Sequence, residues 1–193
     1  KTISIIGLGY IGLPTAALLA SRGYRVIGTD INAKVVETIN RGEVHIVEPD
    51  IEAFVSDAVN KKSLNATSYP QESDIYMICV PTPFHEEQQI PTPNIEYVIN
   101  AVKSISSIVK KDDLVILEST CPVGTTEKIY RILKEEGAPV DDIHIAYCPE
   151  RFNPGDPAHG VRQVARVIGC SNPEVGEALV SLYSKLTTED VRY

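Results

Sequence analysis

Short apolar runs alternate with segments of helical composition along the sequence, and no other feature constrains the fold as strongly. The runs read TISIIG, YRVIGTD, DIYMICV, DLVILEST and DIHIAYC. Runs that are apolar at nearly every residue, rather than at every second residue, are typical of parallel strands buried on both faces. The alternation therefore predicts an α/β fold in which helices cover both faces of a mainly parallel sheet.

The segments between and after these runs carry helix and turn signals. Asn32 is expected to cap the helix NAKVVETINRG, which Gly42 would end, and Asn172 is expected to cap the helix NPEVGEALVSLYSKL. ARVIGC and DVRY are predicted to be strands. The stretch PTPFHEEQQIPTPN is the one long polar, proline-rich loop, and loops of this kind are usually functional or mobile.

Composition excludes several classes of protein. The formal net charge of −8 argues against a nucleic-acid surface, which needs a basic stripe. No apolar run approaches the roughly 20 residues of a membrane helix, and no cationic region followed by a cleavage site opens the sequence. Histidines and cysteines lack the spacing of metal ligands. We therefore expect a cytoplasmic protein with no metal and no nucleic-acid or membrane partner, whose reduced thiols are Cys79, Cys121, Cys148 and Cys170.

The first predicted strand runs into a glycine-rich turn, GLGYIG, from Gly7 to Gly12. Gly7 allows the tight turn, Gly9 lets the backbone approach a pyrophosphate, and Gly12 lets the following helix pack close to the sheet. The helix N-terminus offers free N–H groups and a positive dipole to the anion. A glycine motif alone is weak evidence, but its place between a strand and a helix favours a Rossmann-like, doubly wound, dinucleotide-binding domain over residues 1–193.

Asp30, at the end of the next predicted strand, is expected to accept hydrogen bonds from an adenosine ribose. A carboxylate at this position would repel a 2′-phosphate, so NAD is favoured over NADP. Lys34 is expected to reach the same ribose or the adenine edge, although a solvated lysine fits the sequence equally well. The alternative for the whole region is a structural glycine turn with Asp30 as a solvated strand end.

Two further turns, VPTP and STCPVG, follow predicted strands. Ligands bind at the carboxyl ends of strands in open parallel sheets, so both turns are expected to face the cofactor. Thr82 and Ser119 would serve equally well as turn-forming or capping residues, and their role stays open. The predicted cofactor contacts are Gly7, Gly9, Tyr10, Ile11, Gly12, Asp30, Lys34, Val80, Pro81, Thr82, Ser119 and Thr120.

Longer segments carry a more specific signal than the glycine turn. IGLGYIGLPTA, INRGEVHIVEPD, VPTPF, LVILESTCPVGTTEK and IAYCPER together resemble the amino-terminal, NAD-binding domain of the UDP-glucose/GDP-mannose dehydrogenase family. The resemblance covers essentially the whole chain. The PER sequence after the last of these strands resembles the branch that acts on acetamido sugars rather than the UDP-glucose branch.

The resemblance implies an oxidoreductase of polysaccharide biosynthesis that converts the C6 alcohol of a nucleotide sugar to a carboxylate, using two NAD and a cysteine-bound intermediate. It favours a UDP-N-acetylhexosamine, UDP-N-acetylmannosamine first, with UDP-N-acetylglucosamine and UDP-glucose as alternatives. Thr120 matches the family's threonine that helps to hold the catalytic water, and Glu150 matches a glutamate proposed for acid–base chemistry. The family's second glutamate is replaced here by proline, so its role is not carried over. The residues expected to line the sugar are Arg151, Phe152, Asn153, Pro154 and Gly155.

The resemblance also implies parts that this sequence does not contain. The family's nucleophile lies in a GGHC-like motif beyond the dinucleotide domain, and none of the four cysteines matches it. A central helix and a C-terminal nucleotide-sugar-binding domain are absent as well. We therefore expect the cofactor domain of a dimeric or larger enzyme, inactive and monomeric by itself. Two alternatives stay open: a β-hydroxyacid dehydrogenase, which shares an IGLGxxG start, and a non-catalytic NAD-binding module.

Overall fold

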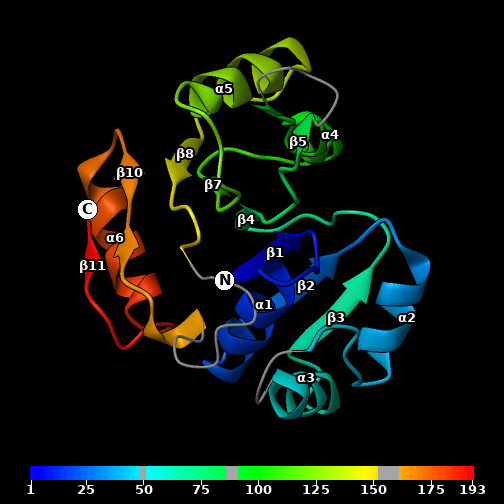
Figure 1. The fold of residues 1–193 in the computed structure, drawn as a ribbon. Coiled ribbons are helices and arrows are strands. Elements are labelled where there is room, and N and C mark those ends of the chain that lie inside the picture. The colour runs from blue at the N-terminus through cyan, green and yellow to red at the C-terminus, as the bar shows by residue number, and fades with distance from the viewer. Residues whose placement is uncertain (48–50, 86–90, 152–160) are drawn as a thin grey trace.

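A computed structural model describes residues 1–47, 51–85, 91–151 and 161–193. The main sheet consists of β1 (Thr2–Ile6), β2 (Arg25–Thr29), β3 (Leu64–Thr67), β4 (Ile75–Ile78), β7 (Leu114–Leu117), β8 (His144–Tyr147) and β10 (Gly169–Cys170). The strand order is β10-β8-β7-β4-β1-β2-β3 (Figure 1). Every neighbouring pair is parallel except β10 and β8, which are antiparallel. The predicted doubly wound, mainly parallel sheet is confirmed.

Helices cover both faces of this sheet (Figure 1). Alternate residues of β4 point into two separate cores: Ile75 and Met77 belong to one, Tyr76 and Ile78 to the other. Because both sets are buried, β4 is apolar at every position, and this is the pattern that the sequence displays. The first core contains α1 (Gly12–Ser21), α2 (Ala33–Asn40), α3 (Ile51–Asn60) and α6 (Pro173–Tyr183), and the second contains α4 (Glu96–Ile105) and α5 (Thr125–Glu135).

Two expected helix caps are confirmed. The side chain of Asn32 accepts a hydrogen bond from the Lys34 N–H at the start of α2, and Asn172 caps α6 in the same way. Gly42, just past the end of α2, has a φ of +78°, the left-handed conformation that favours glycine. Within the four described ranges, no helix has the length and apolar character needed to cross a bilayer.

Three short elements depart from the sequence prediction. The sequence pattern does not predict β3, because this edge strand buries only Leu64 and Ala66 and exposes Asn65, so it lacks an apolar run. ARVIGC, predicted as one strand, forms two: β9 (Arg166–Val167) pairs with β11 (Val191–Arg192), whereas β10 joins the main sheet. The polar loop contains the small antiparallel pair β5 (Phe84–His85) and β6 (Thr92–Pro93), and a 3-10 helix, η1, covers Val161–Gln163.

The contact of α1 with the turn before it yields a stability test. A Cβ added at Gly12 would lie 1.8 Å from the carbonyl oxygen of Gly7, and this backbone atom cannot rotate away. We expect Gly12→Ala to lower the free energy of unfolding by about 2–3 kcal/mol through overpacking. Gly169→Ala is the matched control, because its Cβ would meet no atom closer than 3.9 Å. Urea denaturation of both variants gives the comparison, and equal losses would contradict the close approach.

Candidate functional site

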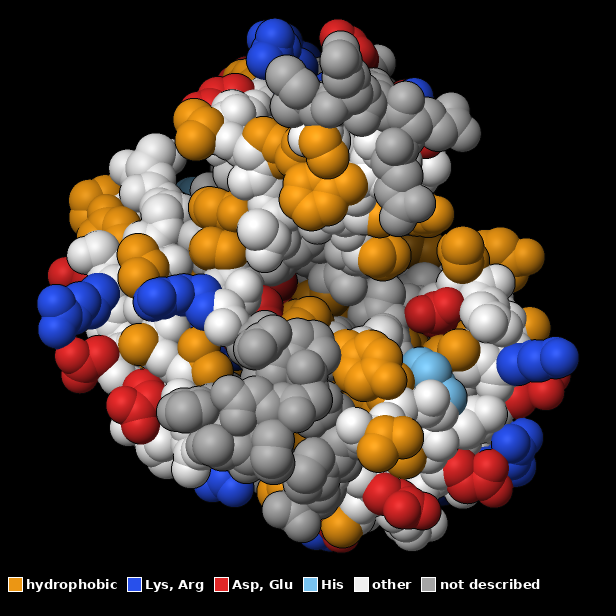
Figure 2. All heavy atoms as spheres, in the orientation of Figure 1, with side chains coloured by type: hydrophobic (Ala, Val, Ile, Leu, Met, Phe, Trp, Pro, Cys, Tyr) orange, Lys and Arg blue, Asp and Glu red, His pale blue; other side chains and the backbone are white. Residues whose placement is uncertain are grey.

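The candidate site lies at the carboxyl ends of β1 and β4, two neighbouring strands at which the chain changes the direction in which it adds strands to the sheet. From β1 the chain proceeds to β2 and β3 on one side, and then crosses to β4, β7 and β8 on the other. Loops leaving the carboxyl ends of β1 and β4 therefore run in opposite directions, and ligands of such sheets bind in the crevice between them. In the orientation of Figure 1, the surface shows a notch between the region of α4 and that of α2 (Figure 2).

The glycine turn after β1 is held tightly and leaves open space at one point. Gly7 has a φ of +93°, and its N–H donates to the Thr29 carbonyl oxygen at 2.8 Å, which ties the turn to β2. A Cβ at Gly7 would lie 2.9 Å from the carbonyl oxygen of Cys79, so no larger residue fits. At Gly9, by contrast, an added Cβ would meet nothing within 4 Å. The backbone at Gly9 is therefore accessible to a ligand at the N-terminus of α1.

Asp30 is fixed by the backbone rather than free at a strand end. One carboxylate oxygen accepts a hydrogen bond from the Leu8 N–H at 3.0 Å, and the other accepts one from the Asn32 N–H at 2.9 Å. These bonds join the glycine turn to the start of α2. Each oxygen keeps a further lone pair that can accept a ligand hydroxyl. Lys34 lies one turn further along with an exposed side chain.

The turns after β4 and β7 are bound to each other through side-chain hydroxyls. Ser119 Oγ donates to the Val80 carbonyl oxygen at 2.7 Å, and Thr82 Oγ1 donates to the Thr120 carbonyl oxygen at 2.8 Å. Thr82 and Ser119 therefore have the turn-forming role that the sequence left open, whether or not they also contact a cofactor. The Thr120 side chain is exposed.

Behind these turns lies a buried polar cluster that the sequence analysis did not identify. Glu118 is 0% exposed and Arg166 is 1% exposed. The Glu118 carboxylate accepts hydrogen bonds from the Tyr183 hydroxyl at 2.7 Å and the Cys79 thiol at 3.2 Å. The only local signal was a charged residue within or directly after an apolar run, in LVILE and ARVIGC.

Glu150 belongs to the same cluster. The Arg166 guanidinium forms an ion pair with the Glu150 carboxylate and lies over the Tyr183 ring, 5.5 Å from its centre. The Glu150 N–H donates to the Glu118 carbonyl oxygen at 3.0 Å. Glu150 is thus joined to the segment that leads into Thr120.

Burial and charge shift the pKa values of this cluster in opposite directions. Burial raises the pKa of the Glu118 carboxyl, and the nearby Arg166 guanidinium partly opposes this shift. Burial by itself would lower the pKa of Arg166, but the carboxylates of Glu118 and Glu150 outweigh it and the pKa is raised. Arg166 therefore stays charged, as a guanidinium beside two buried carboxylates should.

The residues predicted to line the sugar are only partly described. The Arg151 N–H donates to Glu150 Oε1 at 2.8 Å, and the Arg151 side chain is exposed. Phe152, Asn153, Pro154 and Gly155 lie outside the described residues.

The thiols near the site are poor nucleophiles. Burial raises the pKa of Cys121 to about 11 and that of Cys148 to about 12, and burial next to Glu118 raises the pKa of Cys79 well above its usual value. A nucleophilic cysteine needs a lowered pKa, because the thiolate is the reactive form. Cys79 and Cys148 are buried, while Cys121 and Cys170 are half-buried. Among the described residues, no group of three or more His, Cys, Asp or Glu side chains is placed to hold a metal ion.

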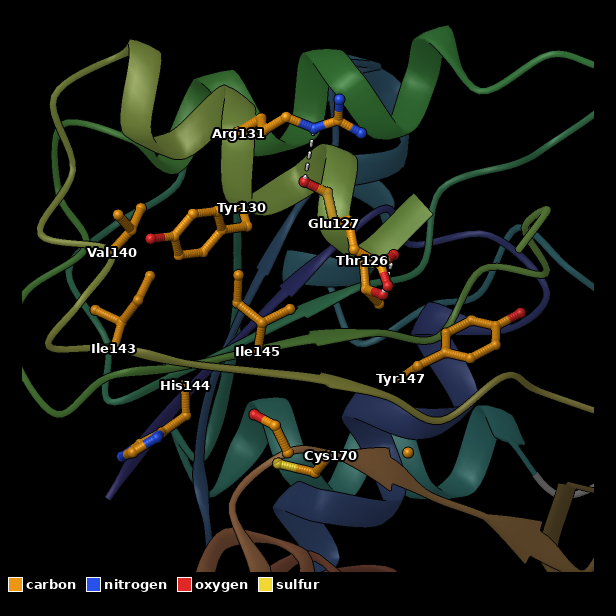
Figure 3. A pocket seen from close by; sticks show the side chains of 12 residues that line it. Thr126, Glu127, Tyr130, Arg131, Val140, Ile143, His144, Ile145, Tyr147 and Cys170 are labelled. Carbon is orange, nitrogen blue, oxygen red and sulfur yellow. Dashed lines mark hydrogen bonds between the residues drawn. The ribbon is translucent and has the colours of Figure 1, made fainter. Parts of the chain in front are cut away.

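A separate hollow of about 830 Å³ lies between α5 and the edge of the sheet. Tyr130 lines it from α5, Ile143 from the segment before β8 and Ile145 from β8 itself (Figure 3). It forms because β10 pairs with only the second half of β8, at Ala146 and Tyr147. No residue predicted to contact cofactor, water or sugar is among the described residues that line it.

Comparison with known proteins adds independent findings. Residues 1–187 match the sequence profile of the UDP-glucose/GDP-mannose dehydrogenase family, NAD binding domain. The chain is 48% identical over 192 residues to a UDP-N-acetyl-D-mannosamine dehydrogenase of Yersinia pestis, covering 95% of this chain and 45% of that protein. An NDP-N-acetyl-D-galactosaminuronic acid dehydrogenase of Ralstonia solanacearum is 44% identical, with the same shares covered.

A solved structure agrees with these relatives. The UDP-D-ManNAc dehydrogenase from Pyrococcus horikoshii has a TM-score of 0.88 at 33% identity, with 100% of this chain and 46% of that chain covered. The chain therefore spans less than half the length of the relatives it matches.

The raised thiol pKa values predict slow alkylation. At pH 8, roughly 0.1% of a thiol with the pKa of Cys121 is ionised, against roughly a quarter of a free cysteine. We expect iodoacetamide to modify Cys121 about two orders of magnitude more slowly than the same residue in the urea-unfolded chain, with a rate that rises about tenfold per pH unit below that pKa. Timed alkylation with mass spectrometry measures both rates. Equal rates in folded and unfolded chains would contradict the burial described above.

Proposed function

The chain belongs to the UDP-glucose/GDP-mannose dehydrogenase family, and on this premise we propose that it is the NAD-binding part of a nucleotide-sugar 6-dehydrogenase. The proposed reaction oxidises the C6 alcohol of a UDP-N-acetylhexosamine to the uronate. Each turnover consumes one water and two NAD and releases two NADH and three protons, which balances the four-electron oxidation. UDP-N-acetylmannosamine is the favoured substrate, because the relatives named for it are among those with the highest identity. Family membership sets aside the β-hydroxyacid dehydrogenase alternative.

The observation that carries this proposal is the combination of accessible backbone at Gly9 and a fixed carboxylate at Asp30. Open space at Gly9 fits a pyrophosphate at the N-terminus of α1, since no protein atom lies within 4 Å of where a Cβ would stand. The hydrogen bond from the Leu8 N–H orients Asp30 toward the same turn, which suits a ribose and disfavours a 2′-phosphate. When bound, NAD supplies the hydride acceptor. Lys34, Tyr10 and the turns after β4 and β7 are proposed to complete the contacts.

Thr120 and Glu150 are the proposed residues on the sugar side. The exposed hydroxyl of Thr120 can hold a water, since its backbone is fixed by Thr82. Glu150 is proposed to exchange protons with the C6 oxygen or this water, because its backbone is bonded to the segment that leads into Thr120. Arg151 and the segment after it are proposed to line the sugar.

The nucleophile is proposed to come from a further domain of the full-length protein. The chain spans 45% of the Yersinia pestis relative, and the thiols of Cys79, Cys121 and Cys148 have raised pKa values. A central helix and a second, sugar-nucleotide-binding domain would supply the remaining groups. We propose that the full-length protein is a homodimer or a larger oligomer in the cytoplasm.

Binding of NAD by the chain itself tests the cofactor part. We expect NAD to bind more tightly than NADP, because Asp30 repels the 2′-phosphate. Gly9→Ala should weaken NAD binding by at least about tenfold, since its methyl group occupies the pyrophosphate position, while the free energy of unfolding changes by less than about 1 kcal/mol. Gly169→Ala is the control that should leave both quantities unchanged. Isothermal titration calorimetry decides, and equal affinities for NAD in the two variants would contradict the proposal.

Turnover by the full-length protein tests the reaction. We expect UDP-N-acetylmannosamine to yield two NADH per sugar, faster than UDP-N-acetylglucosamine or UDP-glucose, and the 193-residue chain to bind NAD without producing NADH. Thr120→Ala should lower kcat by about 10²-fold, because the water loses a fixed partner, while Thr126→Ala, a threonine outside the site, should not. NADH absorbance at 340 nm is the readout. NAD binding without NADH from any of the three sugars would favour a non-catalytic NAD-binding module.

A further inference from the structure

We propose that Arg166 is a positioning residue for the reaction: it fixes the direction in which the Glu150 carboxylate points toward the sugar. This inference rests on the proposed function, because it assigns Arg166 a role through the acid–base residue of that reaction. It adds a residue of the small β9–β11 pair to a site otherwise built from turns of the main sheet.

The two oxygens of Glu150 have different partners. Oε2 pairs with Nη2 of Arg166, and Oε1 accepts the Arg151 N–H at 2.8 Å. One contact would leave the carboxylate free to rotate about its terminal torsion, whereas two contacts on different oxygens define its plane. Glu150 is 8% exposed, so solvent competes little with either partner.

Arg166 is itself held from both ends. Its backbone N–H donates to the Asp190 carbonyl oxygen at 2.9 Å, within the pairing of β9 with β11. Its guanidinium lies over the Tyr183 ring of α6, 5.5 Å from the centre. The side chain therefore extends from a fixed strand to the carboxyl ends of β7 and β8, where Glu118 and Glu150 lie.

The energetic cost of burying Arg166 argues against a role that is limited to stabilising the fold. The Nε and Nη1 atoms of Arg166 are buried and make no hydrogen bond to a described residue. Buried donors without protein partners are costly, and a buried ion pair generally stabilises a fold no better than apolar side chains of similar volume. Glu118 has its own donors in Tyr183 and Cys79, so the direct ion pair of Arg166 goes to Glu150.

A double-mutant cycle in the full-length protein tests this role. Arg166→Lys keeps the charge but loses the planar fork, and we expect it to lower kcat at least about tenfold with a change in KM below about threefold. In a Glu150→Gln background, the same substitution should lower kcat by less than about twofold, because the group it positions is already gone. Arg192→Lys, at an exposed ion pair on the neighbouring strand, is the matched control and should leave kcat unchanged.

The outcomes separate this inference from the function it rests on. If the wild-type protein is active and Arg166→Lys lowers kcat by the same factor in both backgrounds, or not at all, the positioning role is wrong and the proposed function stands. If the wild-type protein forms no NADH with any of the three sugars, both the proposed function and the positioning role of Arg166 are wrong. NAD affinity and melting temperature, measured for every variant, show whether a loss of kcat reflects general unfolding.

A spectroscopic measurement keeps the test decisive if Arg166→Lys does not fold. In the isotope-labelled 193-residue chain, the Arg166 side-chain N–H resonances should be protected from exchange, and Glu150→Gln should shift them. The exposed Arg192 serves as the internal reference and should not respond. Arg166 resonances that exchange as fast as those of Arg192, or that ignore Glu150→Gln, would overturn the contact and the positioning role with it.

Discussion

A parallel sheet that is buried on both faces can carry polar and charged functional groups only at the ends of its strands. The position of the candidate site follows from that constraint. β1, β4 and β7 are enclosed by two cores, so a polar side chain inside them finds few partners. The glycine turn after β1 and the turns after β4 and β7 are where the strands leave the cores. Their backbone groups and short side chains hold one another, which makes the candidate site stiff before any ligand binds.

The buried cluster around Glu118 and Arg166 is an exception, because it places charged side chains where solvent does not reach. Glu118 extends β7 by one residue into a region with no solvent, and Arg166 enters the same region from another strand pair. Taking either charge out of water costs several kcal/mol, and the cost is offset only when charges and donors surround one another. Tyr183 and Cys79 donate to Glu118, while Arg166 pairs with Glu150. The cluster thereby links the carboxyl ends of β4, β7 and β8 with α6 and β9.

Each side of the candidate site is supported by its own set of hydrogen bonds. The proposed cofactor side consists of the glycine turn and Asp30, which a hydrogen bond connects to each other. The proposed sugar side consists of Thr120 and Glu150, and Glu150 is bonded through its backbone to Glu118, two residues before Thr120. The proposed hydride transfer requires reacting groups that are held in fixed positions, and the hydrogen bonds behind both sides would provide that support. The separate hollow beside α5 lies outside this network.

The sequence by itself determined the layered architecture, because strands buried on two faces are apolar at nearly every position and the core strands show that pattern. It also determined the caps at Asn32 and Asn172, since each cap depends on neighbours within a few residues of chain. The glycine turn and Asp30 were predicted from a motif, although the hydrogen bond that joins them spans 22 residues. Only the tertiary structure decided the rest. The edge strand β3 buries one face and has no apolar run, and ARVIGC divides between two sheets because its two ends meet different partners. Glu118 and Tyr183 are 65 residues apart in the chain. Which charges share a buried space is fixed by how distant strands and helices pack, and no local pattern of residues records it.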